Sequence, residues 1–189
     1  MQNPLKIRRA TPSDLPLITR FTDLLARFHG DSYICDPTVI MRDVFGPISG
    51  ARVYFGEHEN RAITYAVCTT EIALHRNQRR LHIHLFHVLK VHRRTGVAQQ
   101  MVAYLQHVAQ LEGASALTVS ADLQNEAAQQ SYLAMGFKRR ALTGAYFLKS
   151  FQSDSSALLQ RFDKASSPLA ACHVNNTDPF YPTQTPLCA

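Results

Sequence analysis

Two arginines, a threonine and a glycine stand between an apolar run and an amphipathic segment in KVHRRTGVAQQMV, residues 90–102. A strand that leads into a helix exposes unpaired backbone N–H groups, which carry the positive end of the helix dipole. Gly96 and Ala98 keep the first helical turn small, and Arg93 and Arg94 add full charges. The stretch therefore predicts a phosphate-binding junction, although taken alone it also fits a solvated turn. It is not a Walker loop, since neither GxxxxGK[ST] nor GxGxxG occurs in the chain.

A second pattern, NEAAQQSYLAMGF, begins at Asn125, which lies 125 − 96 = 29 residues after the glycine of the junction. Its spacing is N-x-x-A-x-x-x-Y-x-x-x-G-F, with Ala128, Tyr132, Gly136 and Phe137 at the fixed positions. The asparagine suits the start of a helix and the glycine suits its end. The pattern therefore places Tyr132 on a helix that follows a buried strand.

The two stretches together resemble the GNAT superfamily of acetyl-CoA-dependent N-acetyltransferases over about residues 4–150. Val88, Arg93, Gly96 and Ala98 match that family's acetyl-CoA motif, V-x-x-x-x-[QR]-x-x-G-x-[GA]. In strand layout the chain is most similar to the diamine and polyamine acetyltransferases. The resemblance implies a single α/β domain, in which a central twisted mixed sheet is flanked by helices and splayed strands form the acetyl-CoA groove.

The resemblance also implies where acetyl-CoA, the cosubstrate, would bind. Its pyrophosphate would lie on the backbone amides of residues 93–98, and its pantetheine would run along Val88–Lys90, with Asn125 contacting it from the second pattern. Lys138 is a further candidate for a phosphate contact. The implied cofactor-binding residues are Val88, Lys90, Arg93, Arg94, Thr95, Gly96, Val97, Ala98 and Asn125.

Acetyl transfer to an amine needs a neutral amine, a donor for the developing oxyanion and a proton for the leaving thiolate. Tyr132 matches the position that the family uses as general acid, and a backbone N–H near Val88 would hold the oxyanion. The alternative for Tyr132 is a residue that only packs one face of its helix.

Three histidines in the strand LHIHLFHV, residues 81–88, are candidates for the base that accepts the proton of the amine. His84 falls where polyamine-type members carry a glutamate, and an imidazole with an ordinary pKa near 6.5 can accept a proton at neutral pH. Strand alternation predicts His82 on the same face as His84 and His87 on the other face. The alternatives are half-buried strand residues without a catalytic role, or a zinc site, for which no nearby Cys or Asp pair completes a ligand set. We therefore expect no metal.

The segment FHGDSYICDP, residues 28–37, lies where family members wrap the acceptor. Candidate acceptor-binding residues are His29, Asp31, Tyr33 and Asp36, and a plain helix stop followed by a turn is the alternative. Losing the family's glutamate removes a charge that would attract a polycation, so spermidine-like acceptors fit this sequence poorly.

Hydrophobic periodicity predicts the elements that must position these residues. We expect helices near residues 11–29, 39–45, 96–111 and 125–135, and strands near 5–8, 52–55, 62–74, 81–88, 115–121, 137–141 and 145–149. This order indicates a sheet that is partly antiparallel and partly parallel. After about residue 151 the composition becomes rich in Ser, Asn, Thr and Pro, so we expect a domain over 1–150 and a flexible or partly helical extension over 151–189.

Composition limits the class of protein. The 189 residues are 46% hydrophobic, which suits one packed domain, and the net charge of +6 suits an anionic partner. Four scattered cysteines form no CxxC pair, and neither a secretory signal nor a membrane span is evident, so we expect a cytoplasmic protein. The family suggests a homodimer.

Three functions remain open at this stage. The first is acetylation of a small-molecule primary amine. The second is acetylation of a macromolecule, either a protein amine or an aminoacyl-tRNA, although the basic residues are dispersed over several loops and a nucleic-acid partner is not expected. The third is a CoA-binding protein without catalysis, which the intact phosphate loop and Tyr132 argue against.

Overall fold

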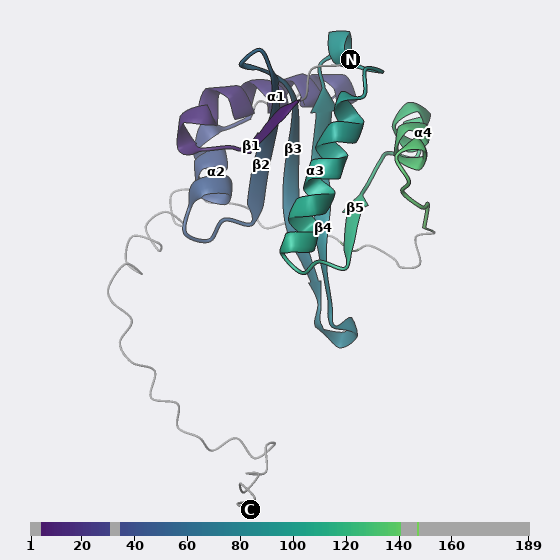
Figure 1. Ribbon diagram of the computed structural model, residues 1–189. Helices are drawn as coiled ribbons and strands as arrows, with labels where there is room; N and C mark the ends of the chain where they lie inside the picture. Colours follow the sequence, from purple (N-terminus) through teal and green to yellow (C-terminus); the bar gives the residue numbers. More distant parts are fainter. Residues whose placement is uncertain (1–4, 31–34, 141–146, 148–189) are drawn as a thin grey trace, which may run out of the picture. The chain divides into compact units, whose positions relative to one another are not determined.

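The computed structural model describes residues 5–30, 35–140 and 147 of the chain (Figure 1). One five-stranded sheet has the order β1-β2-β3-β4-β5. Its strands are β1 (Lys6–Arg9), β2 (Ala51–His58), β3 (Arg61–Ala73), β4 (Gln78–Val88) and β5 (Ala116–Val119). The first four strands are antiparallel to their neighbours, and β5 pairs with β4 in parallel. The mixed sheet expected from the sequence is confirmed.

Helices flank both faces of this sheet. The longer ones are α1 (Leu15–His29), α3 (Val97–Leu111) and α4 (Glu126–Ala134), and α2 (Pro37–Ile40) is a single turn that continues into the π-helical turn η2 (Met41–Phe45). Short 3-10 turns are η1 (Pro12–Asp14), η3 (Leu74–Arg76) and η4 (Lys90–His92). The α1 helix ends at Gly30, whose φ of 81° gives the left-handed cap typical of a helix C-terminus.

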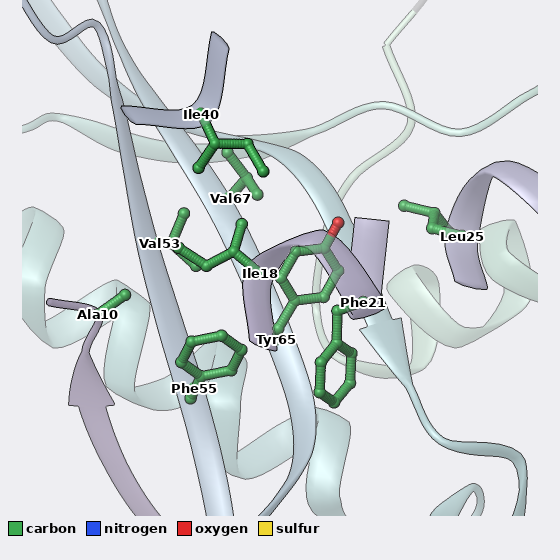
Figure 2. Packing of buried hydrophobic residues seen from close by; sticks show 9 residues of the cluster. All are labelled: Ala10, Ile18, Phe21, Leu25, Ile40, Val53, Phe55, Tyr65 and Val67. Carbon is green, nitrogen blue, oxygen red and sulfur yellow. The ribbon is translucent and has the colours of Figure 1, made fainter. Parts of the chain in front are cut away.

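Two apolar cores lie on opposite faces of the sheet. On one face α1 and α2 pack over β2 and β3, and Figure 2 shows nine buried residues of this cluster. Phe21 lies at its centre, with its ring 5.2 Å from Tyr65 and 5.8 Å from Phe55 between ring centroids. On the other face Met101 and Leu105 of α3 are fully buried against the middle of the sheet. The helical apolar spacing seen in the sequence thus corresponds to these two buried faces.

A β-bulge interrupts β4 at His84. Val67 pairs with Leu85 and the next residue of β3, Cys68, pairs with Ile83, so His84 is the extra residue. The parallel pairing between β4 and β5 covers only Arg80–Ile83 of β4. Beyond it β5 ends, and the chain turns away toward α4 (Figure 1). The two strands therefore separate beyond the bulge, in agreement with the splayed strands that the resemblance implied.

The expected strand over 137–141 differs from the structure. Phe137–Arg140 belongs to neither a helix nor a strand, while Phe137 packs against the α3 core. Ala141 and, apart from Phe147, the expected strand over 145–149 lie outside the described residues, as does the boundary near residue 150. Within the described part of the chain, no helix is long and apolar enough to cross a membrane.

An ion-pair network fixes the corner between β1 and α1. The Arg8 guanidinium donates to both carboxylate oxygens of Asp14 at 2.8 Å, and its Nε donates to Glu57 at 2.7 Å. The backbone N–H of Thr11 also donates to Asp14. The bonds from Arg8 are the main reason that the pKa of Asp14 is lowered from 3.8 to about 2.

We expect Asp14→Asn to lower the free energy of unfolding by about 1–2 kcal/mol at pH 7, because it removes a charge-assisted bidentate pair. A carboxyl group with a lowered pKa stabilises the fold above its unfolded pKa, and this contribution disappears as pH falls through the folded value. The difference between wild type and variant should therefore hold at pH 5–7 and shrink between about pH 4 and pH 2. Urea denaturation at these pH values measures the difference in the free energy of unfolding.

Asp43→Asn is the matched control, because its ion pair with Arg42 is exposed and should contribute under about 0.5 kcal/mol. A difference independent of pH would contradict the account.

Candidate active site

The junction between β4 and α3 presents unpaired backbone donors. The chain turns through Arg94 (φ 62°) and Gly96 (φ 79°), and Gly96 caps α3 without a side-chain hydrogen bond. The Thr95 hydroxyl donates to the His92 carbonyl at 2.7 Å, and this hydrogen bond within the loop stabilises its conformation. Among the described residues, no acceptor faces the N–H groups of residues 97–99, the first three of the helix. Since these groups carry the positive end of the α3 dipole, they form a site suited to a phosphate.

The end of β4 presents a second set of backbone groups, which no neighbouring strand pairs. Leu89 N–H donates to the Ile63 carbonyl at 2.9 Å, so these two residues form a hydrogen-bonded pair. In an antiparallel ladder the neighbouring pair, Thr64 and Val88, then has its N–H and C=O groups directed away from the partner strand. Val88 therefore directs both groups to the edge of β4 that β5 leaves open.

Arg93 lies across this open edge. Its Nε donates to the Val88 carbonyl at 3.0 Å, and its guanidinium carbon lies 5.2 Å from the centroid of the Phe28 ring on α1. The sequence predicts a phosphate contact for Arg93, whereas here the side chain joins the end of α1 to the end of β4. Lys90, Arg94 and Lys138, the other expected phosphate ligands, have exposed side chains.

Strand topology brings the two sequence patterns to one edge of the sheet. The strands β4 and β5 are parallel, so the segments that follow their carboxyl ends emerge on the same side. The first segment is the loop before α3, and the second leads to Asn125 at the start of α4. In the part that the structure describes, we find no hydrogen bond or ring contact that joins Asn125 or Tyr132 directly to the loop.

Tyr132 and Asn125 are held by local contacts in α4. The Tyr132 ring packs edge-to-face on Phe137 at 5.8 Å, and the Phe137 N–H donates to the Tyr132 carbonyl. Burial raises the pKa of Tyr132 above its ordinary value of 10, so its hydroxyl stays protonated at neutral pH. The side-chain oxygen of Asn125 accepts from Ala128 N–H at 3.1 Å and caps the helix. Tyr132 can therefore act as a proton donor, and the amide NH₂ of Asn125 is the part that remains to contact a ligand.

The bulge at His84 changes the faces of the histidines. The sequence places His87 on the opposite face from His84 and His82, and for His82 this prediction is wrong, because the extra residue shifts the alternation by one. His87 pairs with Tyr65, whose side chain belongs to the α1 core, and it packs against Phe21 at 6.3 Å. His82 is on this same face, since it lies between Leu81 and Ile83, which both point to the α3 core.

His82 and His84 lie close together on β4, with ring centroids 6.3 Å apart. The Nδ1 atom of His82 is 3.0 Å from the Thr118 hydroxyl of β5 and 3.9 Å from a carboxylate oxygen of Glu71. Burial lowers the pKa of His82, against the opposing effect of Glu71. His84 is exposed, so of the three histidines it is the one open to an incoming amine. No group of three or more His, Cys, Asp or Glu residues in the described ranges could hold a metal ion.

The expected acceptor segment is only partly described. Asp36 caps α2, because its carboxylate accepts from the backbone N–H and the hydroxyl of Thr38 at 2.8 and 2.7 Å. These bonds lower the pKa of Asp36. His29 is the last residue of α1, and its side chain, like Asp31 and Tyr33, lies outside the described residues.

Three residues near the site were missed by the sequence reading. Phe28 contacts Arg93, and Thr118 and Glu71 both contact His82. Phe28 looks like an ordinary member of the apolar stripe of α1, and only its 55% exposure distinguishes it. Thr118 is the polar residue of an otherwise apolar strand, and this was the one available signal.

The donor set fits acetyl-CoA by its chemistry. Free amides at the start of α3 suit a pyrophosphate, and the N–H and C=O of Val88, which no neighbouring strand pairs, suit an amide-containing extended chain. Arg94 and Lys90 supply exposed positive charge beside them. The chemistry of these residues therefore suits an anionic cosubstrate with an extended arm.

The acetyltransferase (GNAT) family model matches residues 20–137, and the chain therefore belongs to the GNAT acetyltransferase family. Solved structures share the fold. An aminoglycoside acetyltransferase from an uncultured soil metagenomic sample, in complex with sisomicin, is 17% identical, with a TM-score of 0.65 over 77% of this chain and 97% of that one. A possible acetyltransferase from Clostridium difficile 630 is 18% identical, with a TM-score of 0.66 over 79% of this chain and 100% of that one. A search of curated protein sequences gave no match.

Proposed function

We propose that this protein is an acetyl-CoA-dependent N-acetyltransferase that acetylates a primary amine of a small molecule by direct attack. The observation that carries the proposal is the open edge of β4 at Val88, which lies next to the uncapped start of α3. An anionic cosubstrate with an extended arm would find amide donors for its phosphates and a backbone edge for the arm in one continuous stretch of chain.

In the proposed reaction acetyl-CoA supplies an acetyl group as a thioester and leaves as a thiol. The amine nitrogen forms a bond to the acetyl carbon, and the carbon–sulfur bond breaks. Val88 N–H donates to the carbonyl oxygen as negative charge develops there. His84 accepts the proton lost by the amine, and Tyr132 donates a proton to the sulfur.

The base matters because an amine with a pKa near 10 is only about one part in a thousand neutral at pH 7. His84 is exposed in the bulge and stands four residues before Val88 on the strand that leads to the cofactor edge. Its neighbour His82 is held by Thr118, and the centroids of the two imidazole rings are 6.3 Å apart.

Release of CoA thiol from acetyl-CoA tests the function directly. The acceptor panel contains diamines, polyamines, amino acids, aminoglycosides and aminoacyl-tRNA, and mass spectrometry identifies the acetylated product. Aminoglycosides are included because structural neighbours act on them. Release with a small amine is expected. Binding of acetyl-CoA without release from any small amine would contradict small-molecule transfer and favour a macromolecular acceptor or a non-catalytic role.

With the best acceptor, His84→Ala is expected to lower kcat/KM about 100-fold at pH 7, in the range found for loss of a general base. The loss should diminish as pH approaches 10, because the amine then becomes neutral without help. The exposed His75 on η3 provides the control, and His75→Ala should leave the pH profile unchanged. An equal loss at every pH would argue that His84 acts through the bulge geometry and not as a base.

The cytoplasmic location and the homodimer belong to the proposal as well. The homodimer rests on the resemblance to the family, and the cytoplasmic location rests on the scattered cysteines of the sequence. Light scattering on the purified full chain measures the oligomeric state, and a mass of one chain, 21.2 kDa, would contradict the dimer.

A further inference from the structure

Arg93 connects two elements that serve different parts of the proposed reaction. Its guanidinium lies over the ring of Phe28, a residue of the last turn of α1. Its Nε donates a hydrogen bond to the Val88 carbonyl on the open edge of β4. Phe28 is 55% exposed, so the contact lies at the surface where a ligand can reach it. The side chain thus joins the end of the first helix to the cofactor edge.

This position conflicts with the proposed binding of acetyl-CoA, on which the inference rests. An extended amide chain on the open edge of β4 needs the Val88 carbonyl as an acceptor, because that carbonyl and its N–H point to this side. Arg93 already donates to it. The pyrophosphate would bind at the start of α3, shortly after Arg93 in the chain. A guanidinium binds a phosphate more strongly than it binds a neutral carbonyl, so the bound cosubstrate would attract the Arg93 side chain away from Val88.

We propose that Phe28 is a positioning residue that holds Arg93 on the Val88 carbonyl in the free protein, so that acetyl-CoA must draw Arg93 away from α1 to bind. The aromatic face of Phe28 stabilises the guanidinium in the position that competes with the ligand. Binding of the cosubstrate then frees the last turn of α1. Binding of acetyl-CoA at the edge of β4 thereby changes the end of α1, which leads into the expected acceptor segment, residues 28–37.

The direction in which loss of the Phe28 ring changes the affinity for acetyl-CoA distinguishes this role from simple support of the site. If Phe28 held Arg93 ready for the phosphate, removing the ring would weaken acetyl-CoA binding. If it holds Arg93 in competition with the ligand, Phe28→Leu tightens binding. For an exposed cation–π contact the expected factor is about 2- to 5-fold in Kd.

Isothermal titration of the full chain with acetyl-CoA measures this effect. Phe28→Leu keeps an apolar side chain and removes the aromatic ring. Phe28→Trp provides a stronger cation–π partner for Arg93 and should weaken acetyl-CoA binding relative to Phe28→Leu. In an Arg93→Ala background, Phe28→Leu should no longer change Kd, because the partner of the ring is gone. Melting temperatures identify any variant that is merely unfolded.

Hydrogen exchange provides a readout that a purely structural residue would not change. Adding acetyl-CoA to wild type should speed exchange at residues 26–30, where the last turn of α1 ends, and this response should be lost in Phe28→Leu. Unchanged or weaker binding of Phe28→Leu, or an equal effect in the Arg93→Ala background, would overturn the inference. Absence of acetyl-CoA binding to wild type would instead overturn the proposed function.

Discussion

Replacing Tyr132 by Phe is expected to lower kcat about 10²- to 10⁴-fold, with the affinity for acetyl-CoA nearly unchanged. The hydroxyl is the only group removed, and in the proposed reaction it supplies the proton to the leaving sulfur. Burial raises the pKa of Tyr132, so the hydroxyl is protonated throughout the neutral range and its ionisation does not limit the rate below about pH 10.

The packing of the ring should survive this change. The edge-to-face contact with Phe137 involves the ring and not the hydroxyl, so we expect the melting temperature to stay within a few degrees of wild type. Tyr104→Phe is the matched control, because Tyr104 lies on α3 and packs edge-to-face on Tyr54 at 6.0 Å. Steady-state kinetics with the best acceptor of the panel compares the variants. A Tyr132→Phe variant with full turnover would remove the general acid from the mechanism.

Gly96→Ala is expected to weaken acetyl-CoA binding by about 10- to 100-fold, the equivalent of about 1.4–2.8 kcal/mol. Gly96 has a φ of 79°, which a residue with a Cβ adopts only at a cost of about 1 kcal/mol. Relief of that strain rotates the peptide planes on either side of the residue. The N–H groups at the start of α3 would then no longer point to a common phosphate position.

Gly113 offers a control for backbone strain, since it lies after the opposite end of α3 with a φ of 69° and open space around its Cβ position. Gly113→Ala should cost a similar amount of stability, about 1 kcal/mol, and leave acetyl-CoA binding unchanged. Urea denaturation and calorimetric titration of both variants separate the two effects. Equal affinity in Gly96→Ala and wild type would show that the junction does not hold the phosphates.

Local signals in the sequence were sufficient to predict most of the described fold. Gly30, Gly96 and Gly113 stand at or next to helix ends, and the structure ends α1 just before Gly30 and places α3 between Gly96 and Gly113. The parallel pair β4–β5 also follows from a strand, a helix and a second strand in that order. These features depend on local propensity and patterning, which a single sequence records.

Features that depend on pairing partners could not be predicted. The position of the β4 bulge depends on which residues of β3 face it, and the sequence of β4 alone gave no sign that His84 would be the extra residue. One residue of shift was enough to reverse the predicted face of His87. The placement of Arg93 on Phe28 is a contact between residues 65 positions apart (93 − 28 = 65), and no periodicity indicates it. The segment from Phe137 to Arg140 has strand-like residues, yet Phe137 packs as a single anchor against the α3 core.

The central claim is that acetyl-CoA binds along the open edge of β4 and at the start of α3. Titration of the ¹⁵N-labelled chain with acetyl-CoA, followed through backbone amide shifts, tests it most directly. We expect saturable shifts that are largest at Val88, Gly96, Val97 and Ala98, the donors that lack partners in the described part of the chain. Shifts confined to other surfaces, or no saturable shifts at all, would contradict the account.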